Sequence, residues 1–192
     1  MENLTKSKLA DALKEEMKTI PFEKISVKEL AEKCNVNRQT FYYHFADIYE
    51  LLEWLCKKEF DSIAKNQSDA SKWQEAVSIL LKYIKDNKAF CLCAMNSDAY
   101  SHIRQYLFNN VAEFIKEYVS YFIGDVTLPK DFMDFLVTFY SYSFAGIFEN
   151  LILGNAVWDD CTLIEYLEIM IKTRFLGIKE YFAAREIEKR TK

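Results

Sequence analysis

The segment KCNVNRQTFYYHF (residues 33–45) places a cluster of polar and aromatic side chains in an otherwise apolar and acidic chain. Phe41 and Phe45 are four residues apart, so on a helix they share a face and would pack inward. Gln39 and Tyr43 are also four apart and point nearly the opposite way. Because an exposed pair of adjacent tyrosines lowers solubility, the segment predicts a short helix whose outer face has a binding role.

Start and turn signals on either side of this helix indicate a second short helix before it. Ser26 and Glu29 have the spacing of a capping box, which predicts a helix over about 27–33. Asn35 lies at the turn, where asparagine tolerates the left-handed conformation better than most residues. Asn37 can cap the following helix, which we expect to end near Phe45. Two short helices joined by a tight turn form a helix-turn-helix pattern.

Helical periodicity continues through the rest of the 192 residues, and glycine (4) and proline (2) are scarce. All-β folds need frequent turn residues, so this scarcity favours an all-α fold. An apolar stripe formed by Leu4, Leu9, Leu13, Met17 and Ile20 predicts a first helix that ends before Pro21. Further helices are expected over about 47–66, 71–87, 88–95, 98–123, 130–153 and 160–185.

Composition excludes several classes of protein. Hydrophobic residues make up 51% of the chain, which is enough for an ordered core, and the net charge of -4 excludes a globally basic nucleic-acid binder. The charged N-terminus is unlike a signal peptide, and the longest uncharged run, residues 135–148, is too short and too rich in Ser, Thr and Tyr to span a bilayer. An odd number of cysteines (5) points to a reducing compartment. We therefore expect a cytoplasmic protein without a membrane partner.

Signals for catalysis and for metal binding are missing from the sequence. It has no glycine-rich phosphate loop, no nucleophile elbow and no His/Cys/Asp cluster at ligand spacing. Cys91 and Cys93 do not share a face of a helix, so structural thiols are the simpler interpretation of these residues. We expect no enzyme activity, no cofactor and no metal.

The outer face of the helix after Asn37 suits DNA. Arginine reads guanine, glutamine can bond adenine and threonine can contact a thymine methyl group. Tyrosine and histidine can donate hydrogen bonds to phosphate oxygens. The alternative is a surface helix in a purely structural helical protein, with its tyrosines and histidine packed against neighbouring segments.

The stretch VKELAEKCNVNRQTFYYHFADIYELL (residues 27–52) resembles the DNA-binding domain of the TetR family of transcriptional regulators. The residues that carry the resemblance are Leu30-Ala31, Val36, Thr40-Phe41-Tyr42, His44-Phe45 and Leu51. The resemblance implies phosphate contacts by Ser26, Thr40, Tyr42 and His44. It implies that Arg38, Gln39 and Tyr43 approach the bases, and Asn37 starts the same recognition helix. The chain departs from the family pattern at Asn35, Asn37 and Ile48, where glycine, serine and lysine are common.

Charge in the N-terminal part gives little help to DNA binding. Residues 1–48 contain eight Lys or Arg and eight Asp or Glu, so their formal charges cancel. A positive surface must therefore come from the arrangement of these residues. Lys6, Lys24 and Lys28 are expected to lie near one edge.

The resemblance also implies two domains: a three-helix helix-turn-helix DNA-binding domain over residues 1–47 and an all-helical regulatory and dimerisation domain over residues 48–192. Such proteins form homodimers through their last two long helices and commonly hold a small-molecule inducer between the others. The stripe expected at the two-fold interface is Ile164, Leu167, Ile171, Phe175 and Ile178. Aromatic residues that could line an inducer pocket are Tyr83, Phe90, Tyr100, Tyr106, Phe114, Tyr118 and Tyr140. The same aromatics could equally form a core.

Residues 4–54 are also similar to a TetR subgroup that includes the activator of dihydroxyacetone kinase operons. In such systems a paralogue of a kinase subunit senses the small molecule. Two alternatives thus stay open for the second domain: a small-molecule inducer, or a ligand-sensing co-regulator protein. In both, the expected partners are an operator in double-stranded DNA and a second copy of the chain.

Overall fold

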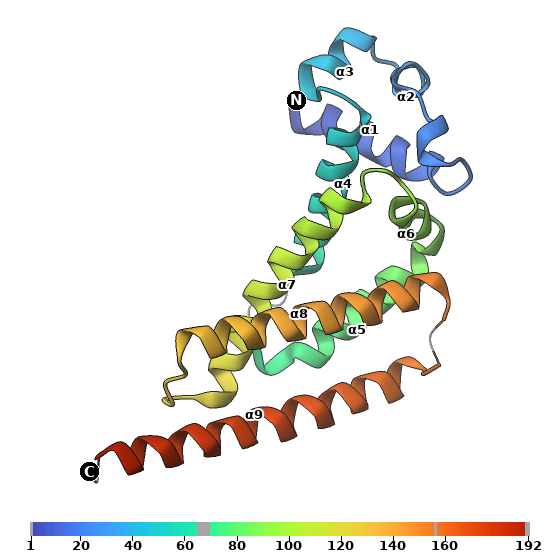
Figure 1. The fold of residues 1–192 in the computed structure, drawn as a ribbon. Coiled ribbons are helices and arrows are strands. Elements are labelled where there is room, and N and C mark those ends of the chain that lie inside the picture. The colour runs from blue at the N-terminus through green and yellow to red at the C-terminus, as the bar shows by residue number, and fades with distance from the viewer. Residues whose placement is uncertain (1, 65–69, 156, 191–192) are drawn as a thin grey trace. The chain divides into compact units, whose positions relative to one another are not determined.

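The computed structural model describes residues 2–64, 70–155 and 157–190, and within these ranges the protein is helical with no strand (Figure 1). The helices are α1 (Glu2–Glu16), η1 (Phe22–Lys24), α2 (Val27–Lys33), α3 (Arg38–His44), α4 (Ile48–Ala64), η2 (Ala70–Lys72), α5 (Trp73–Asp86), α6 (Lys88–Met95), α7 (Tyr100–Ile123), α8 (Lys130–Leu153) and α9 (Asp160–Arg190). The predicted all-α class is confirmed. The bounds of α6 and α8 are those expected, whereas α9 continues past the expected end at residue 185 to Arg190.

The chain divides into two compact units. The first comprises residues 1–66 and 82–107, and the second comprises residues 67–81 and 108–192, so the division falls within α5 and within α7. The division expected at residue 47 separates two functions, DNA binding and regulation, and it stays a prediction.

Local signals around the helix-turn-helix act as the sequence predicts. The Ser26–Glu29 capping box is formed at the start of α2, and the Asn37 side chain caps α3. Asn35 has φ 54°, the left-handed conformation that lets α2 stop and α3 start within a few residues. At the start of α4, Glu50 N–H donates to Asp47 Oδ1 at 2.9 Å, and the Glu50 carboxylate accepts from Ala46 N–H at 2.6 Å. Side chains thus fix the starts of α2, α3 and α4.

The core of the first unit joins α1 to α3 and α4. Leu9 and Leu13 of α1, and Met17 directly after it, are buried in the same cluster as Phe41 and Phe45. The residues of the expected stripe pack in this core except Leu4, which is 60% exposed. The helix itself ends at Glu16, so Met17 and Ile20 lie in the turn that follows it and not on the expected helix.

In the second unit, α8 and α9 run side by side in opposite directions (Figure 1). Phe132 contacts Phe182, and Tyr140 contacts Phe175, at ring-centroid distances of 5.1 Å each. The stripe predicted for the two-fold interface lies on this inner side, because Leu167, Ile171 and Phe175 are buried in the core of the unit. That prediction is therefore wrong for the stripe.

A different apolar face of α8 and α9 is exposed. Its members, each about half exposed, are Phe135, Phe139, Tyr142 and Leu153 on α8 and Tyr166, Ile169, Met170, Leu176 and Tyr181 on α9. Gly146 of α8 and Gly177 of α9 have no neighbouring atom within 4 Å of the place where a Cβ would stand. Within the described residues of a single chain, no other helix therefore approaches closely at Gly146 or Gly177.

Helix α8 is the one described helix that is long and apolar enough to cross a membrane by length and composition. Only 22% of its most apolar stretch is buried. A helix that packs in a soluble bundle meets the same criterion, so the exposed apolar side of α8 fits a helix–helix contact as well as lipid.

Candidate nucleic-acid interface

Helix α3 has one buried and one exposed face, as the spacing of its residues predicts. Phe41 is fully buried and Phe45 is 3% exposed, whereas Tyr42 is 51% and Tyr43 is 76% exposed. Arg38 and Gln39 are exposed as well. The aromatic pair on the inner face holds α3 on the core, so the outer face can meet a flat or grooved partner without any refolding.

Three of the predicted DNA-contacting residues also shape the backbone. Asn37 Oδ1 accepts hydrogen bonds from Thr40 N–H at 2.7 Å and from Thr40 Oγ1 at 2.9 Å. Ser26 Oγ donates to Glu29 Oε2 at 2.7 Å, and bonds from the Ser26 side chain and then its backbone N–H lower the pKa of Glu29. The hydroxyls of Ser26 and Thr40 must therefore break these hydrogen bonds before they can donate to a phosphate.

His44 lies at the C-terminal end of α3 beside two rings. Its ring meets Tyr43 nearly edge-on, with centroids 4.9 Å apart, and its Nδ1 is buried without a hydrogen-bond partner in the described part of the chain. Because Nδ1 is enclosed, Nε2 is the ring nitrogen that can reach a phosphate. This placement agrees with a role in anchoring the DNA backbone.

Most lysines of the first helices are paired with carboxylates. Lys18, Lys28 and Lys33 form ion pairs with Glu15, Glu32 and Glu16, respectively. The predicted positive edge is therefore partly neutralised at Lys28, whose ammonium lies 3.9 Å from the Glu32 carboxylate. The Lys6 ammonium lies 5.8 Å from the ring centroid of Phe45, which directly follows the C-terminal end of α3. Among the described residues, Arg38 forms no ion pair and presents its charge on the exposed face.

Comparison with known proteins agrees with this geometry. The profile of the bacterial regulatory proteins of the tetR family matches residues 9–55, and a profile described as the transcriptional regulator C-terminal region matches residues 71–173. The chain belongs to the TetR family. It is therefore a DNA-binding transcriptional regulator, and the predicted resemblance is confirmed.

One curated relative and one solved structure that are similar to this TetR regulator are described as dihydroxyacetone kinase operon activators. The HTH-type dhaKLM operon transcriptional activator DhaS of Lactococcus lactis subsp. lactis (strain IL1403) is 32% identical over 87 residues, which are 45% of this chain and 46% of that relative. The match thus spans about half the length of the relative. A solved structure described as dihydroxyacetone kinase operon activator DhaS shares the fold, with a TM-score of 0.68 over 93% of this chain and 97% of that one, at 23% identity.

The seven aromatic residues predicted to line an inducer pocket are divided between the two units of this regulator. Tyr83, Phe90, Tyr100 and Tyr106 belong to the first unit, and Phe114, Tyr118 and Tyr140 belong to the second. Their role as ligand contacts stays a prediction.

In the first unit, each of these aromatics has a neighbour in the chain itself. Tyr83 and Phe90 flank the Lys14 ammonium at 5.0 Å and 5.4 Å from their ring centroids. The Tyr106 hydroxyl donates to Asp61 Oδ1 at 2.9 Å, and Tyr100 is partly buried at the start of α7. Tyr83 and Phe90 therefore already serve as ring faces for a cation.

In the second unit, the three aromatics form part of the core. Tyr118 stacks on Phe114 and contacts Phe175, which Tyr140 also contacts. The hydroxyls of Tyr118 and Ser141 are buried and have no hydrogen-bond partner in the described part of the chain, and burial raises the pKa of Tyr118. An unpaired buried hydroxyl is costly, so these two atoms are the polar groups in this core that a ligand or water would satisfy.

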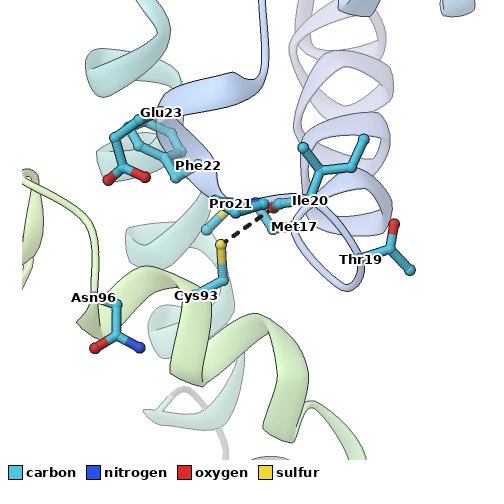
Figure 2. Close-up of a pocket in the computed structure, with 8 residues that line it drawn as sticks. All are labelled: Met17, Thr19, Ile20, Pro21, Phe22, Glu23, Cys93 and Asn96. Atoms are coloured by element: carbon cyan, nitrogen blue, oxygen red, sulfur yellow. Dashed lines mark hydrogen bonds between the residues drawn. The ribbon is translucent and has the colours of Figure 1, made fainter.

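A pocket of about 320 Å³ lies between residues 17–23, which follow α1, and α6 (Figure 2). Its lining residues are Met17, Thr19, Ile20, Pro21, Phe22, Glu23, Cys93 and Asn96. The Cys93 thiol donates to the Ile20 carbonyl oxygen at 3.6 Å. The seven predicted inducer residues do not line this pocket, and sequence periodicity gave no sign of it.

The cysteines differ in their surroundings. Cys161 is exposed, whereas burial, followed by the nearby Cys91 thiol, raises the pKa of Cys56 to about 12. Burial also raises the pKa of Cys91 to about 11. Within the described residues, no group of three or more His, Cys, Asp or Glu side chains could hold a metal ion.

We expect iodoacetamide to label Cys161 well before Cys56 at pH 8. The thiolate is the reactive form, and a pKa near 12 leaves only about one Cys56 in 10⁴ ionised at that pH, with about a tenfold rise for each pH unit. Peptide mass spectrometry over time measures the two rates, and in guanidinium chloride they should converge. Equal rates in the native protein would show that the Cys56 thiol is accessible and ionised.

Proposed function

We propose that this regulator binds an operator as a homodimer, with α3 of each copy in the major groove of DNA. The observation that carries the proposal is the exposed face of α3, where Gln39 and Tyr43 extend from a helix fixed by the Asn37 cap and by buried Phe41. The proposal includes a cytoplasmic location with the chromosome and no catalytic role, cofactor or metal.

Contacts to the bases and to the phosphates are assigned to different residues of α3. Arg38, Gln39 and Tyr43 lie on the exposed face and would approach base edges, where arginine and glutamine form bidentate hydrogen bonds. Tyr42 and His44 would donate to phosphates, which hold the helix in register without reading sequence. Ser26, Asn37 and Thr40 mainly set the positions of α2 and α3, and they would add phosphate contacts when their cap bonds rearrange.

The homodimer would form through the exposed apolar face of α8 and α9. Exposed apolar patches of this size mark contact surfaces, and the open space above Gly146 and Gly177 would let a second copy approach closely. A stable interface buries roughly 1,200 Å² or more in total. Two-fold symmetry would then present two α3 helices to successive turns of the duplex, about 34 Å apart.

Regulation would come from a small molecule bound among the helices after α4. The buried, unpaired hydroxyls of Tyr118 and Ser141 support a polar ligand in the second unit. The similarity to an operon activator favours an alternative, in which the chain activates transcription and a ligand-sensing protein related to dihydroxyacetone kinase binds in place of the small molecule. Operator binding measured with and without each type of partner separates the two.

Gln39→Ala and Tyr43→Ala should each weaken operator binding by about 1–3 kcal/mol and relax preference at one position of each half-site, because each removes one base contact. Tyr42→Phe and His44→Ala should weaken binding to all sequences alike, since they remove phosphate contacts. Fluorescence anisotropy on an operator and on a scrambled duplex gives both affinities. A ratio of affinities unchanged by Gln39→Ala and Tyr43→Ala would show that α3 does not read sequence.

A further inference from the structure

The Lys14 side chain of α1 is enclosed by three later helices of the first unit. Its ammonium donates to Glu59 Oε2 of α4 at 2.6 Å and lies 5.0 Å from the ring centroid of Tyr83 in α5 and 5.4 Å from that of Phe90 in α6. The side chains of Lys14 and Glu59 are 17% and 21% exposed. A carboxylate and two aromatic faces form a cage that recognises an ammonium group specifically. We call these four residues the Lys14 cage.

The cage is connected to the recognition helix through the core of the first unit. Leu9 and Leu13 lie on the same helix as Lys14 and are buried in one cluster with Phe41 and Phe45. A displacement of α1 must therefore move α3 or open the core, since close-packed interiors transmit displacement. The position of Lys14 thus bears directly on the position of Gln39 and Tyr43.

Apolar packing also joins α1 to α6. Leu9 and Leu13 of α1 lie in the same buried cluster as Phe90 and Ala94 of α6. A pocket of about 320 Å³ lies between residues 17–23, which follow α1, and α6 (Figure 2). To the apolar packing, the Lys14 cage adds a directional contact between α1 and the helices α4, α5 and α6.

We propose that Lys14 is a positioning residue for operator binding, which ties α1 to α4, α5 and α6 and so sets the place of α3 relative to the regulatory helices. The proposal rests on the proposed binding of a two-half-site operator by a homodimer. An ion pair shielded from water adds little net stability compared with apolar residues of the same size, and orientation is what it can supply. Movement of α5 or α6 by an effector would reach α3 through this cage.

Replacing both charges tests the proposal. The double variant Lys14→Met, Glu59→Leu keeps apolar bulk and leaves no unpaired charge. We expect it to melt within a few degrees of the unchanged protein. Its affinity for a duplex with two half-sites should fall about tenfold, while its affinity for a duplex with one half-site stays the same. A loosely held α3 can still bind one half-site. Once one copy is bound, however, the α3 of the other copy is less well placed for the second half-site, so its effective concentration there is lower. The duplexes are those that the unchanged protein selects from a random pool.

Two matched variants complete the experiment. Lys58 pairs with Asp11 at 3.4 Å and joins the same helices, α1 and α4, but its side chain is 38% exposed and that of Asp11 is 66% exposed. Lys58→Ala with Asp11→Ala should leave both affinities unchanged. Lys14→Arg, which keeps the charge, should retain most of the two-site affinity.

The outcomes separate the two proposals. An unchanged ratio of two-site to one-site affinity in the double variant overturns the positioning role. A parallel loss of both affinities with a lower melting temperature also overturns it, because that pattern indicates a structural role alone. If the unchanged protein selects no duplex from the pool, the proposed operator binding itself fails.

Discussion

Phe41→Ala is expected to lower the free energy of unfolding by about 3–5 kcal/mol. Phe41 is fully buried and contacts Phe45 and Tyr42 at ring-centroid distances of 5.9 Å and 5.5 Å. Its removal leaves a cavity beneath the recognition helix, in a core that also holds α1 and α4. Denaturant titration followed by circular dichroism measures the change, and operator binding should fall with the folded fraction.

The neighbouring residue provides the control for this prediction. Tyr42 is on the same helix and is 51% exposed, so Tyr42→Ala should change the free energy of unfolding by no more than about 0.5 kcal/mol. Similar losses in the two variants would mean that α3 is not held by its Phe41 face. The assignment of Gln39 and Tyr43 to the outer face would then fail as well.

Phe139→Glu combined with Ile169→Glu is expected to convert a homodimer into monomers at micromolar concentration. Both side chains are about half exposed on the apolar face of α8 and α9, where two added carboxylates per copy would have to be buried without partners. Loss of the second recognition helix should reduce operator affinity by about 10²–10⁴-fold. Sedimentation velocity and fluorescence anisotropy measure the two effects.

Ile79 offers a matched surface position for this experiment. It is 41% exposed on α5, outside the apolar face of α8 and α9, so Ile79→Glu should preserve the dimer. The proposal of a homodimer through α8 and α9 is overturned if the unchanged protein sediments as a monomer at micromolar concentration. It is also overturned if Ile79→Glu dissociates the protein as effectively as the double variant does.

The helix-turn-helix could be predicted from sequence because short-range interactions define it. Ser26 with Glu29, Asn37 with Thr40 and the left-handed Asn35 each act within a few residues, and all three have the expected geometry. Hydrophobic periodicity likewise assigned Phe41 and Phe45 to the core. The family pattern added the roles of exposed residues such as Tyr42, which spacing alone does not assign.

The contacts of the later helices could not be derived in the same way. Helix α9 has apolar residues on two sides, and periodicity does not tell which side meets the same chain. The stripe through Leu167, Ile171 and Phe175 proved to be the inner side, and the exposed side carries Ile169 and Met170. The Lys14 cage was equally hidden, because Lys14, Glu59 and Phe90 come from distant parts of the sequence.

The carboxylates at the start of α4 have a consequence for the ionic atmosphere around DNA. Asp47 and Glu50 accept hydrogen bonds from backbone N–H groups there and bring negative charge next to Ile48. Lys18, Lys28 and Lys33 are likewise engaged by carboxylates. Each phosphate that a protein leaves unneutralised keeps its condensed cations, so fewer cations are released on binding. We therefore expect discrimination by this regulator to depend more on the fit of α3 to DNA than on attraction to the polyanion.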